Sequence, residues 1–481
     1  MNIGIFSPGA YCVLFNELIL HSNKNNFTID NEKVNWHILT NTNIYLNHFE
    51  KTVSEENICY LFQNFNKMME DNNLDIDLSN YHGSIYKDIL TDKHSFFTKD
   101  SNYQIKNASV TYKIWKNYLI KSRLNYIVFP DIEYVEGMIL LALCRELDIK
   151  VLYYVHARNI GEALFAKNNN EEYYLIKDSK KVGLMDFISK HKNNLSKAYN
   201  VSIDFNQKRY NCIVPKYKRK FLDKLVTYLK NKLIYEKHYL KEDMSFIIKF
   251  RSLFLNLLNK YRSSRKLIYE KYVTVKNLKS VKYKFIYFPL QITPESSINN
   301  LEPYFVDQLR AIDLLVMNID SNIKVVVKEH PAFVGEREES FYKKLANKPG
   351  VEIASLQLSS KELLNDSIMV SSITGTVCLE AMLQNKPLFQ FGKTFFYQDS
   401  FGFDSFHNMN TDLLEIISGK RNNNIDKILE DLYPVLFNFY IELPMQYYYQ
   451  PKPIALMEEN LNNTLKAIDF YITNIENGNM K

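Results

Sequence analysis

The sequence lacks the features that mark several large classes of protein. No apolar run approaches the roughly 20 residues that a membrane-spanning helix needs, and the first residues show neither the basic segment nor the apolar stretch of a signal peptide. Five cysteines are scattered through 481 residues without a C-x-x-C pair, which disfavours a disulfide framework or a zinc site. We therefore expect a protein of the reducing cytoplasm, not integral to a membrane.

Glycine is also scarce, with 13 residues. Neither the dinucleotide fingerprint G-x-G-x-x-G nor the phosphate loop G-x-x-x-x-G-K-[ST] occurs, which disfavours NAD and ATP as ligands. Asp75-Ile76-Asp77 spells D-x-D, a pattern that can hold a metal with a sugar diphosphate. It follows no convincing strand, and three residues recur easily by chance, so we expect neither a metal nor a cofactor.

Composition and length indicate an ordinary globular protein of two domains, because 46% of the residues are hydrophobic and 24% are charged. The formal charge of +6 is unevenly spread. Residues 208–284 hold 22 Lys and Arg against 5 Asp and Glu, or about +17, with apolar residues at helical spacing. This predicts a basic helical insertion over 206–280. It is either a solvated hairpin or a surface for anionic lipid headgroups, and we expect no nucleic-acid partner.

Residues 1–205 alternate apolar strands with amphipathic helices. Residues 2–6 predict a strand, and residues 124–155 predict strand, helix and strand, the βαβ unit of a parallel sheet. Within this unit, the loop from Pro130 to Gly137 offers three carboxylates. One of them can take a proton from a substrate hydroxyl as a general base. We prefer Glu136, with Asp131 and Glu133 behind it, although all three can equally serve to cap the helix.

Residues 281–440 show a very regular alternation. Strands are predicted at 285–290, 323–327, 351–354, 368–371 and 387–391, helices at 304–317, 340–347 and 376–384, and a capping box at 359–362. Residues 441–481 form a predicted helical tail. The fold class we expect is α/β and GT-B-like: two Rossmann-like domains that face a cleft, with the basic insertion between them.

Ligands of an open α/β sheet bind beyond the carboxyl ends of its strands, so the polar residues there are candidates. Lys328 and His330 follow one strand and offer donors to a phosphate, and Pro331 stops that strand. Hydroxyls and a glycine follow another strand and favour an anion site over a simple helix cap. The candidate donor-binding residues are Lys328, His330, Pro331, Ser371, Ser372, Thr374, Gly375, Thr376, Glu380, Gln291 and Glu295.

These strand-end motifs resemble the capsule polysaccharide biosynthesis family, which includes the Kdo transferases of capsule export systems. The resemblance covers about 110 residues of the C-terminal domain and rests on motifs in a specific order. They are Phe288-Pro289-Leu290-Gln291, Pro294-Glu295, Asp307-Gln308-Leu309, Lys328-Glu329-His330-Pro331, Ser371-Ser372-Ile373-Thr374-Gly375-Thr376, Glu380-Ala381, Lys386-Pro387 and Phe391-Gly392.

The His-Pro and Ser-Ser pairs are also similar to two motifs of bacterial GT-B sialyltransferases, where they contact the phosphate and cytidine side of a CMP-sugar. The resemblance implies that His330 and Ser371 or Ser372 bind the donor phosphate. The acid-acid-Gly motif of those enzymes has its nearest match at Val135-Glu136-Gly137, without the first acid. His156 and Arg158 end a strand of the same domain and are candidates for holding a sugar carboxylate.

The sequence therefore predicts a metal-independent glycosyltransferase of bacterial capsule or surface polysaccharide synthesis. It would transfer a sugar, such as Kdo or another ulosonic acid from a CMP-sugar, to a glycan or lipid-linked acceptor. We expect it in the cytoplasm, peripheral on the inner face of the cell membrane if residues 208–284 bind lipid. Two alternatives stay open: a sugar-nucleotide 2-epimerase, and a non-catalytic factor for polysaccharide assembly or export.

Overall fold

The computed structural model describes the chain apart from residues 9–10, 42–48, 50–51, 64, 72–77, 80, 93–100, 131, 133, 159–161, 177–182, 197–265, 294, 332, 335, 403–404, 442–453 and 481. Contacts between residues divide the described chain into two units. The first unit comprises residues 1–182 and 432–481, and the second unit comprises residues 183–196 and 266–431. Asp75, Asp77, Asp131, Glu133 and most of the predicted basic insertion lie outside the described residues.

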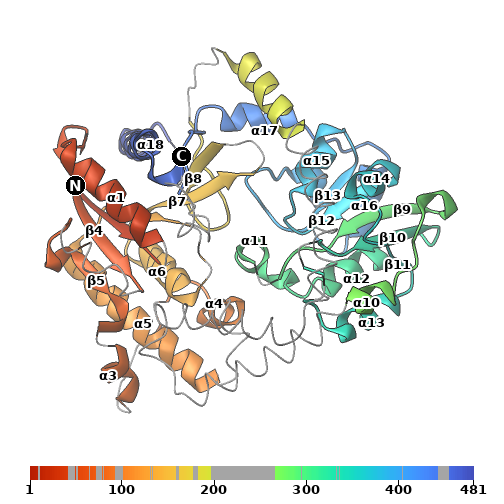
Figure 1. Ribbon diagram of the computed structural model, residues 1–481, viewed down its shortest axis with the longest axis horizontal. Helices are drawn as coiled ribbons and strands as arrows, with labels where there is room; N and C mark the ends of the chain where they lie inside the picture. Colours follow the sequence, from red (N-terminus) through yellow and green to blue (C-terminus); the bar gives the residue numbers. More distant parts are fainter. Residues whose placement is uncertain are drawn as a thin grey trace. The chain divides into compact units, whose positions relative to one another are not determined.

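The first unit is built on a six-stranded sheet in the order β5-β4-β1-β6-β7-β8 (Figure 1). All neighbouring strands are parallel except β7 and β8, which are antiparallel. The predicted parallel βαβ unit is confirmed, as β6, α6 and β7. The elements of this unit are β1 (Asn2–Phe6), α1 (Tyr11–Lys24), β2 (Thr28–Ile29), β3 (Glu32–Lys33), β4 (Asn35–Thr40), η1 (Glu55–Asn57), β5 (Ile58–Tyr60), η2 (Leu61–Gln63), α3 (Phe65–Glu70), α4 (Ile85–Thr91), α5 (Ser101–Ser122), β6 (Tyr126–Phe129), α6 (Val135–Glu146), β7 (Lys150–Ala157), β8 (Glu162–Ala166), η7 (Ile454–Leu456) and α18 (Glu458–Glu476).

The end of the chain returns to the first unit. Phe437 pairs with Ala163 of β8, with backbone hydrogen bonds of 2.8 and 2.9 Å. The carboxylate of Glu476, at the end of α18, accepts from the hydroxyl of Tyr126 and pairs with Lys150 at 3.0 Å. The C-terminal helix, predicted correctly as a helix, therefore packs on the sheet that the N-terminal residues build.

The second unit contains a five-stranded parallel sheet in the order β11-β10-β9-β12-β13. The chain runs outward from β9 to β11 and then returns to place β12 on the other side of β9, which makes a doubly wound sheet. The elements are α10 (Lys266–Glu270), η3 (Leu278–Ser280), β9 (Lys284–Pro289), α11 (Ser296–Asn299), η4 (Pro303–Phe305), α12 (Leu309–Met317), β10 (Ile323–Lys328), α13 (Glu339–Ala346), β11 (Val351–Ile353), α14 (Ser360–Asp366), β12 (Met369–Ser372), α15 (Val377–Leu383), β13 (Leu388–Gln390), η5 (Asp399–Phe401), α16 (Met409–Ile417) and α17 (Ile425–Leu432).

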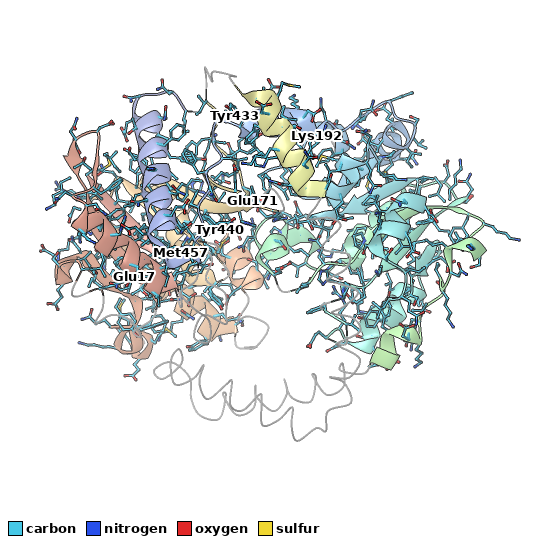
Figure 2. The ribbon with its side chains drawn as sticks, turned by 45° about the horizontal axis from the view of Figure 1, so that its top comes forward. Glu17, Glu171, Lys192, Tyr433, Tyr440 and Met457 are labelled. Atoms are coloured by element: carbon cyan, nitrogen blue, oxygen red, sulfur yellow. The ribbon has the colours of Figure 1, made fainter. Side chains whose placement is uncertain are left out.

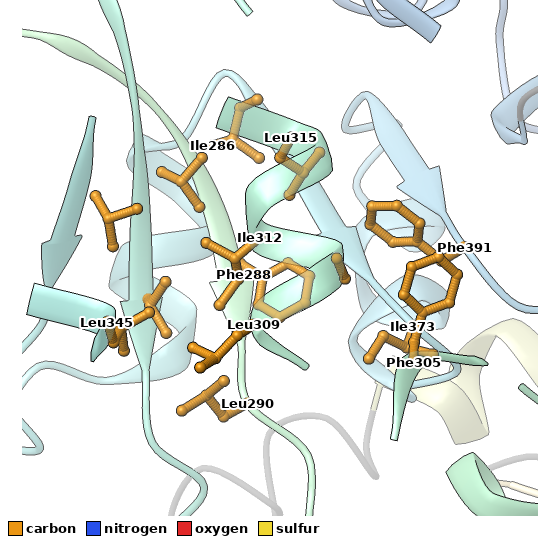
Figure 3. Packing of buried hydrophobic residues seen from close by; sticks show 14 of the residues in the cluster. Ile286, Phe288, Leu290, Phe305, Leu309, Ile312, Leu315, Leu345, Ile373 and Phe391 are labelled. Carbon is orange, nitrogen blue, oxygen red and sulfur yellow. The ribbon is translucent and has the colours of Figure 1, made fainter. Parts of the chain in front are cut away.

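Alternate residues of these strands face two different cores. Ile286, Phe288, Val325, Val327 and Ile373 belong to one cluster with side chains of α12, α13 and α16 (Figure 3). The residues between them face the opposite side, against which α14 and α15 pack. Burial on both faces is typical of parallel sheets and explains why these strands are nearly continuous apolar runs in the sequence.

Candidate functional site

The strand-end motifs of the second unit lie at one edge of its sheet. Because all five strands are parallel, the residues after β9, β10 and β12 emerge together. On one side of β9, Lys328 of β10 pairs with Pro289. On the other side, Val370 of β12 pairs with Tyr287, so Ser372, two residues later, lies level with Pro289. Ser372 also pairs with Gln390 of β13. Lys328 and Ser372 thus stand two strands apart, about 10 Å between their Cα atoms.

Lys328 and Ser372 also share a face of the sheet. Their neighbours Val327 and Ile373 both belong to the core cluster on the α12 side. Since side chains alternate along a strand, Lys328 and Ser372 face the α14 and α15 side. Both serines are fully buried. Ser371 faces the α12 side, and its hydroxyl has no hydrogen-bond partner among the described residues. Of the two serines predicted to bind a donor, only Ser372 shares the face of Lys328.

Lys328 is a cation buried at the end of β10. Its side chain is 5% exposed, and its ammonium makes no hydrogen bond or ion pair with any described residue. Burial lowers the pKa of this ammonium to about 8, and the more distant carboxylate of Glu362 offsets only part of that effect. A buried charge is costly unless something pairs with it, so an anion at this position would be stabilised.

A glutamate that we did not select from the sequence holds the neighbouring His330 segment. The buried carboxylate of Glu329 accepts from the backbone N–H of His330 at 2.7 Å, from Arg337 Nε at 2.7 Å and from the Tyr342 hydroxyl at 2.6 Å. The other end of the Arg337 guanidinium donates to the carbonyl of Gln291. The segments after β9 and β10 are therefore tied together by one buried ion pair.

The strand order reverses between β9 and β12, and the side chain of Gln291 connects the segments that follow these two strands. Its Oε1 accepts from the backbone N–H of Thr374 at 3.0 Å, and its Nε2 donates to Thr374 Oγ1 at 3.1 Å. Gln308 in turn holds the backbone of Gln291, accepting from its N–H at 2.9 Å and donating to its carbonyl at 2.8 Å. We predicted that Gln291 contacts the donor. In the structure, both polar atoms of its side chain bond to Thr374 and so connect the segments after β9 and β12.

The predicted hydroxyl loop is held mainly by contacts of its own. Ser372 Oγ accepts from the N–H of Gly375 at 3.2 Å, and a Cβ on Gly375 would lie 2.6 Å from that oxygen, so any larger residue would displace the Ser372 hydroxyl. Thr374 Oγ1 donates to the carbonyl of Ser297. Thr376 occupies the N-cap of α15 without a side-chain cap bond. The alternative was that the hydroxyls of Ser372 and Thr374 only cap the helix. Neither residue is the N-cap of α15.

Two acids predicted near the donor have different surroundings. Glu295 accepts from the hydroxyl of Ser297 at 2.7 Å, a local bond within its own loop. Glu380 lies in the first turn of α15, where burial raises the pKa of its carboxyl to about 7. Pro331 is half-buried directly after His330.

In the first unit, Glu136 is buried at the start of α6. The N-cap of this helix is Tyr134, without a side-chain cap bond, and the N–H of Val135 donates to Asp92 at 3.3 Å instead. A Cβ on Gly137 would lie 2.7 Å from Ile132 Cγ2, so this glycine permits close packing of the helix. Packing alone accounts for the glycine of the Glu136-Gly137 pair.

The second candidate pair of the first unit is engaged within the protein. Arg158 forms an ion pair with Glu171 at 3.0 Å, and both side chains are mostly buried. The ring of His156 lies 6.2 Å from that of Tyr440, a residue labelled together with Glu171 in Figure 2. These contacts favour a structural role for Arg158, as a guanidinium with a buried partner is less available to a sugar carboxylate.

Comparison with known proteins supports the expected family. The family described as "Capsule polysaccharide biosynthesis protein" matches residues 189–405. The predicted resemblance is confirmed over that range. The matched range contains each of the strand-end motifs of the second unit, from Gln291 to Glu380. No curated protein matches the chain.

Solved structures offer only distant likenesses. The UDP-GlcNAc 2-epimerase of Methanocaldococcus jannaschii is 11% identical, with 89% of this chain and 95% of that chain covered and a TM-score of 0.25. KpsC of Thermosulfurimonas dismutans, a beta Kdo 2,7 transferase, is 12% identical, with 75% and 90% covered and a TM-score of 0.31. The lipopolysaccharide outer core galactosyltransferase WaaB is 10% identical, with 98% and 100% covered and a TM-score of 0.29. Likenesses at this level do not assign an activity.

Among the described residues, no helix is both long enough and apolar enough to cross a membrane.

Proposed function

We propose that this protein is a GT-B-type glycosyltransferase of bacterial capsule or surface polysaccharide synthesis. It takes a sugar from a nucleotide donor and transfers it to a glycan or lipid-linked acceptor, without a metal. The observation that carries the proposal is the buried ammonium of Lys328, which has no partner among the described residues. It lies on the same face of one sheet edge as Ser372 and two residues before His330. This is the edge at which α/β sheets bind their ligands.

The charge at this edge favours a CMP-linked donor, such as CMP-Kdo or the CMP derivative of another ulosonic acid. Arg337 is neutralised by Glu329, whereas Lys328 has no carboxylate within ion-pair distance among the described residues. One uncompensated positive charge matches the single negative charge of a phosphodiester better than the two charges of a diphosphate.

In the proposed reaction, the acceptor hydroxyl oxygen forms a bond to the anomeric carbon while the bond from that carbon to the phosphate oxygen breaks. The electron pair of the broken bond leaves with the nucleoside monophosphate, whose charge Lys328, His330 and Ser372 stabilise. A carboxylate takes the acceptor proton. We assign that role to Glu136, with Asp131 and Glu133 as the alternatives.

The nucleotide site is tested by thermal unfolding with CMP, UDP, GDP and TDP. A ligand at one hundred times its Kd stabilises the folded protein by about 2.7 kcal/mol, and we expect CMP to raise the Tm most. Ser372→Ala should abolish the CMP-induced rise, whereas Ser371→Ala, the same substitution on the other face of the sheet, should keep it. If no nucleotide raises the Tm, or if both serine variants respond alike, the donor site is misplaced.

Incubation with a donor sugar alone distinguishes the competing functions. A 2-epimerase converts the donor without an acceptor, a transferase requires the acceptor, and an assembly or export factor leaves both unchanged. A change in the donor sugar without an acceptor would replace our proposal with the epimerase.

The localisation that we propose is cytoplasmic, peripheral on the inner face of the membrane. It rests on the charge of residues 208–284, about +17 by sequence. Sedimentation with anionic liposomes should carry the protein down at low salt and release it at high salt. If the protein sediments equally with neutral and with anionic liposomes, it does not bind through anionic headgroups, and the proposed membrane localisation is wrong.

A further inference from the structure

Arg337 stands out because it is buried, charged and outside every motif of the candidate site. Its side chain is 8% exposed and lies against the rings of Phe333 and Phe341, with its Cζ 4.9 and 4.7 Å from the ring centroids. A planar guanidinium between aromatic rings is held in one orientation. Its two hydrogen-bonding edges therefore point in fixed directions.

Each of those edges holds a different segment. Arg337 Nε donates to Glu329, whose other oxygen accepts the backbone N–H of His330. The terminal nitrogen of Arg337 donates to the carbonyl of Gln291. Gln291 carries the connection across the sheet, because its side chain bonds both the N–H and the hydroxyl of Thr374.

We propose that Arg337 is a positioning residue that sets the distance between the His330 segment and the hydroxyl loop of residues 372–376. This inference rests on the proposed function, in which those two segments bind one phosphate. Glu329 neutralises the guanidinium, so Arg337 acts through the segments that it joins and does not contact the donor. A lysine keeps the charge but cannot reach both Glu329 and Gln291, since it lacks the fork of the guanidinium.

The test compares Arg337→Lys with Arg421→Lys. Arg421 forms partly buried bonds to two acids, Asp412 at 2.6 Å and Glu415 at 2.8 Å, but these acids belong to α16 and not to the strand-end segments. Both variants should lose thermal stability, and Arg337→Lys should lose more because its ion pair is more deeply buried. Only Arg337→Lys should weaken CMP binding measured by calorimetry, by roughly three- to thirtyfold.

Amide hydrogen exchange of the unliganded protein provides a reading that needs no nucleotide. Arg337→Lys should accelerate exchange in residues 327–333 and in residues 371–377, because the N–H groups of His330 and Thr374 lose their fixed acceptors. Arg421→Lys should leave both regions unchanged. Should the lysine variant fail to fold, Tyr342→Phe removes one bond to Glu329 and should accelerate exchange in residues 327–333 alone.

The outcomes separate the two proposals. Accelerated exchange without any CMP binding by the wild type would sustain the positioning role and overturn the CMP donor. CMP binding by the wild type with unchanged exchange and unchanged affinity in Arg337→Lys would overturn the positioning role and leave the donor site intact. Equal effects of Arg337→Lys and Arg421→Lys on affinity would reduce Arg337 to a general stabilising residue.

Discussion

Replacing Lys328 by methionine should raise the free energy of unfolding and abolish nucleotide binding. The ammonium is buried at the end of β10 and has no partner in the described part of the chain, so the folded state carries a desolvated charge that the unfolded chain does not. Methionine has a similar length and no charge, and it fills the same space at little cost in packing.

The size of the effect follows from the pKa. Burial lowers the pKa of Lys328 from 10.5 to about 8, and a difference of about 2.5 pH units at 1.36 kcal/mol each corresponds to about 3 kcal/mol. Below pH 8 both states are protonated, and the folded state bears this whole penalty. Between pH 8 and 10.5 the unfolded chain binds more protons than the folded one, so the contribution of Lys328 to stability rises with pH.

Urea unfolding of wild type and Lys328→Met at several pH values measures the difference. At pH 7 the variant should be more stable by up to about 3 kcal/mol, and this advantage should shrink as the pH rises above 8. The control is Lys324→Met on the same face of the same strand, where the lysine is paired with Glu352 and no gain is expected.

The same substitution should have the opposite effect on nucleotide binding. CMP should stabilise the wild type but not Lys328→Met, and the wild-type affinity should fall as the pH rises through about 8 because the free ammonium loses its proton. Lys324→Met should bind CMP normally. A Lys328→Met protein that is less stable at pH 7, or that binds CMP as tightly as the wild type, would refute the reasoning.

Three further substitutions test the other assigned residues. His330→Ala should abolish transfer while circular dichroism shows an intact fold; full activity would remove His330 from the donor site. Glu136→Gln should lose turnover but still bind CMP, and retained turnover would shift the role of base to Asp131 or Glu133. Glu380→Gln should be more stable than the wild type at pH 8 and not at pH 4, because burial raises the pKa of Glu380 to about 7 and stability is lost as the pH rises through that value; equal urea midpoints at both pH values would contradict this.

Much of the second unit could be predicted because its signals are local. Apolar runs bounded by polar residues indicate buried strands wherever they occur, and the capping box at Ser359 and Glu362 is confirmed with both of its bonds. The helix predicted from Tyr304 begins later, at Leu309. The side chain of Asp307 accepts a hydrogen bond from the N–H of Leu309, and the side chain of Gln308 bonds to Gln291. The spacing of apolar residues in the sequence gives no sign of these contacts.

The contacts that hold the candidate site together could not be predicted, because they join residues far apart in the sequence. Arg337 and Gln291 are 46 residues apart, and Gln291 and Thr374 are 83 apart. In the sequence, Arg337 is one charged residue among several in a polar segment. Glu329 stands in the motif Lys328-Glu329-His330-Pro331, but nothing in the sequence marks it for a role. Only the order of strands in the sheet brings these side chains within bonding distance.

The same strand order explains why the family resemblance concentrates in this unit. Each strand-and-helix step adds one strand end to the same edge, so residues spread from Gln291 to Glu380 are gathered at a single place. Ligands of α/β sheets bind at that edge, and the candidate residues therefore recur at each strand end along the chain. In the first unit, Gly137 is explained by its packing against Ile132, and Asp131 and Glu133 lie outside the described residues. The proposed donor site therefore draws on residues from three strand ends of one sheet, and turnover of the Glu136, Asp131 and Glu133 variants assigns the base.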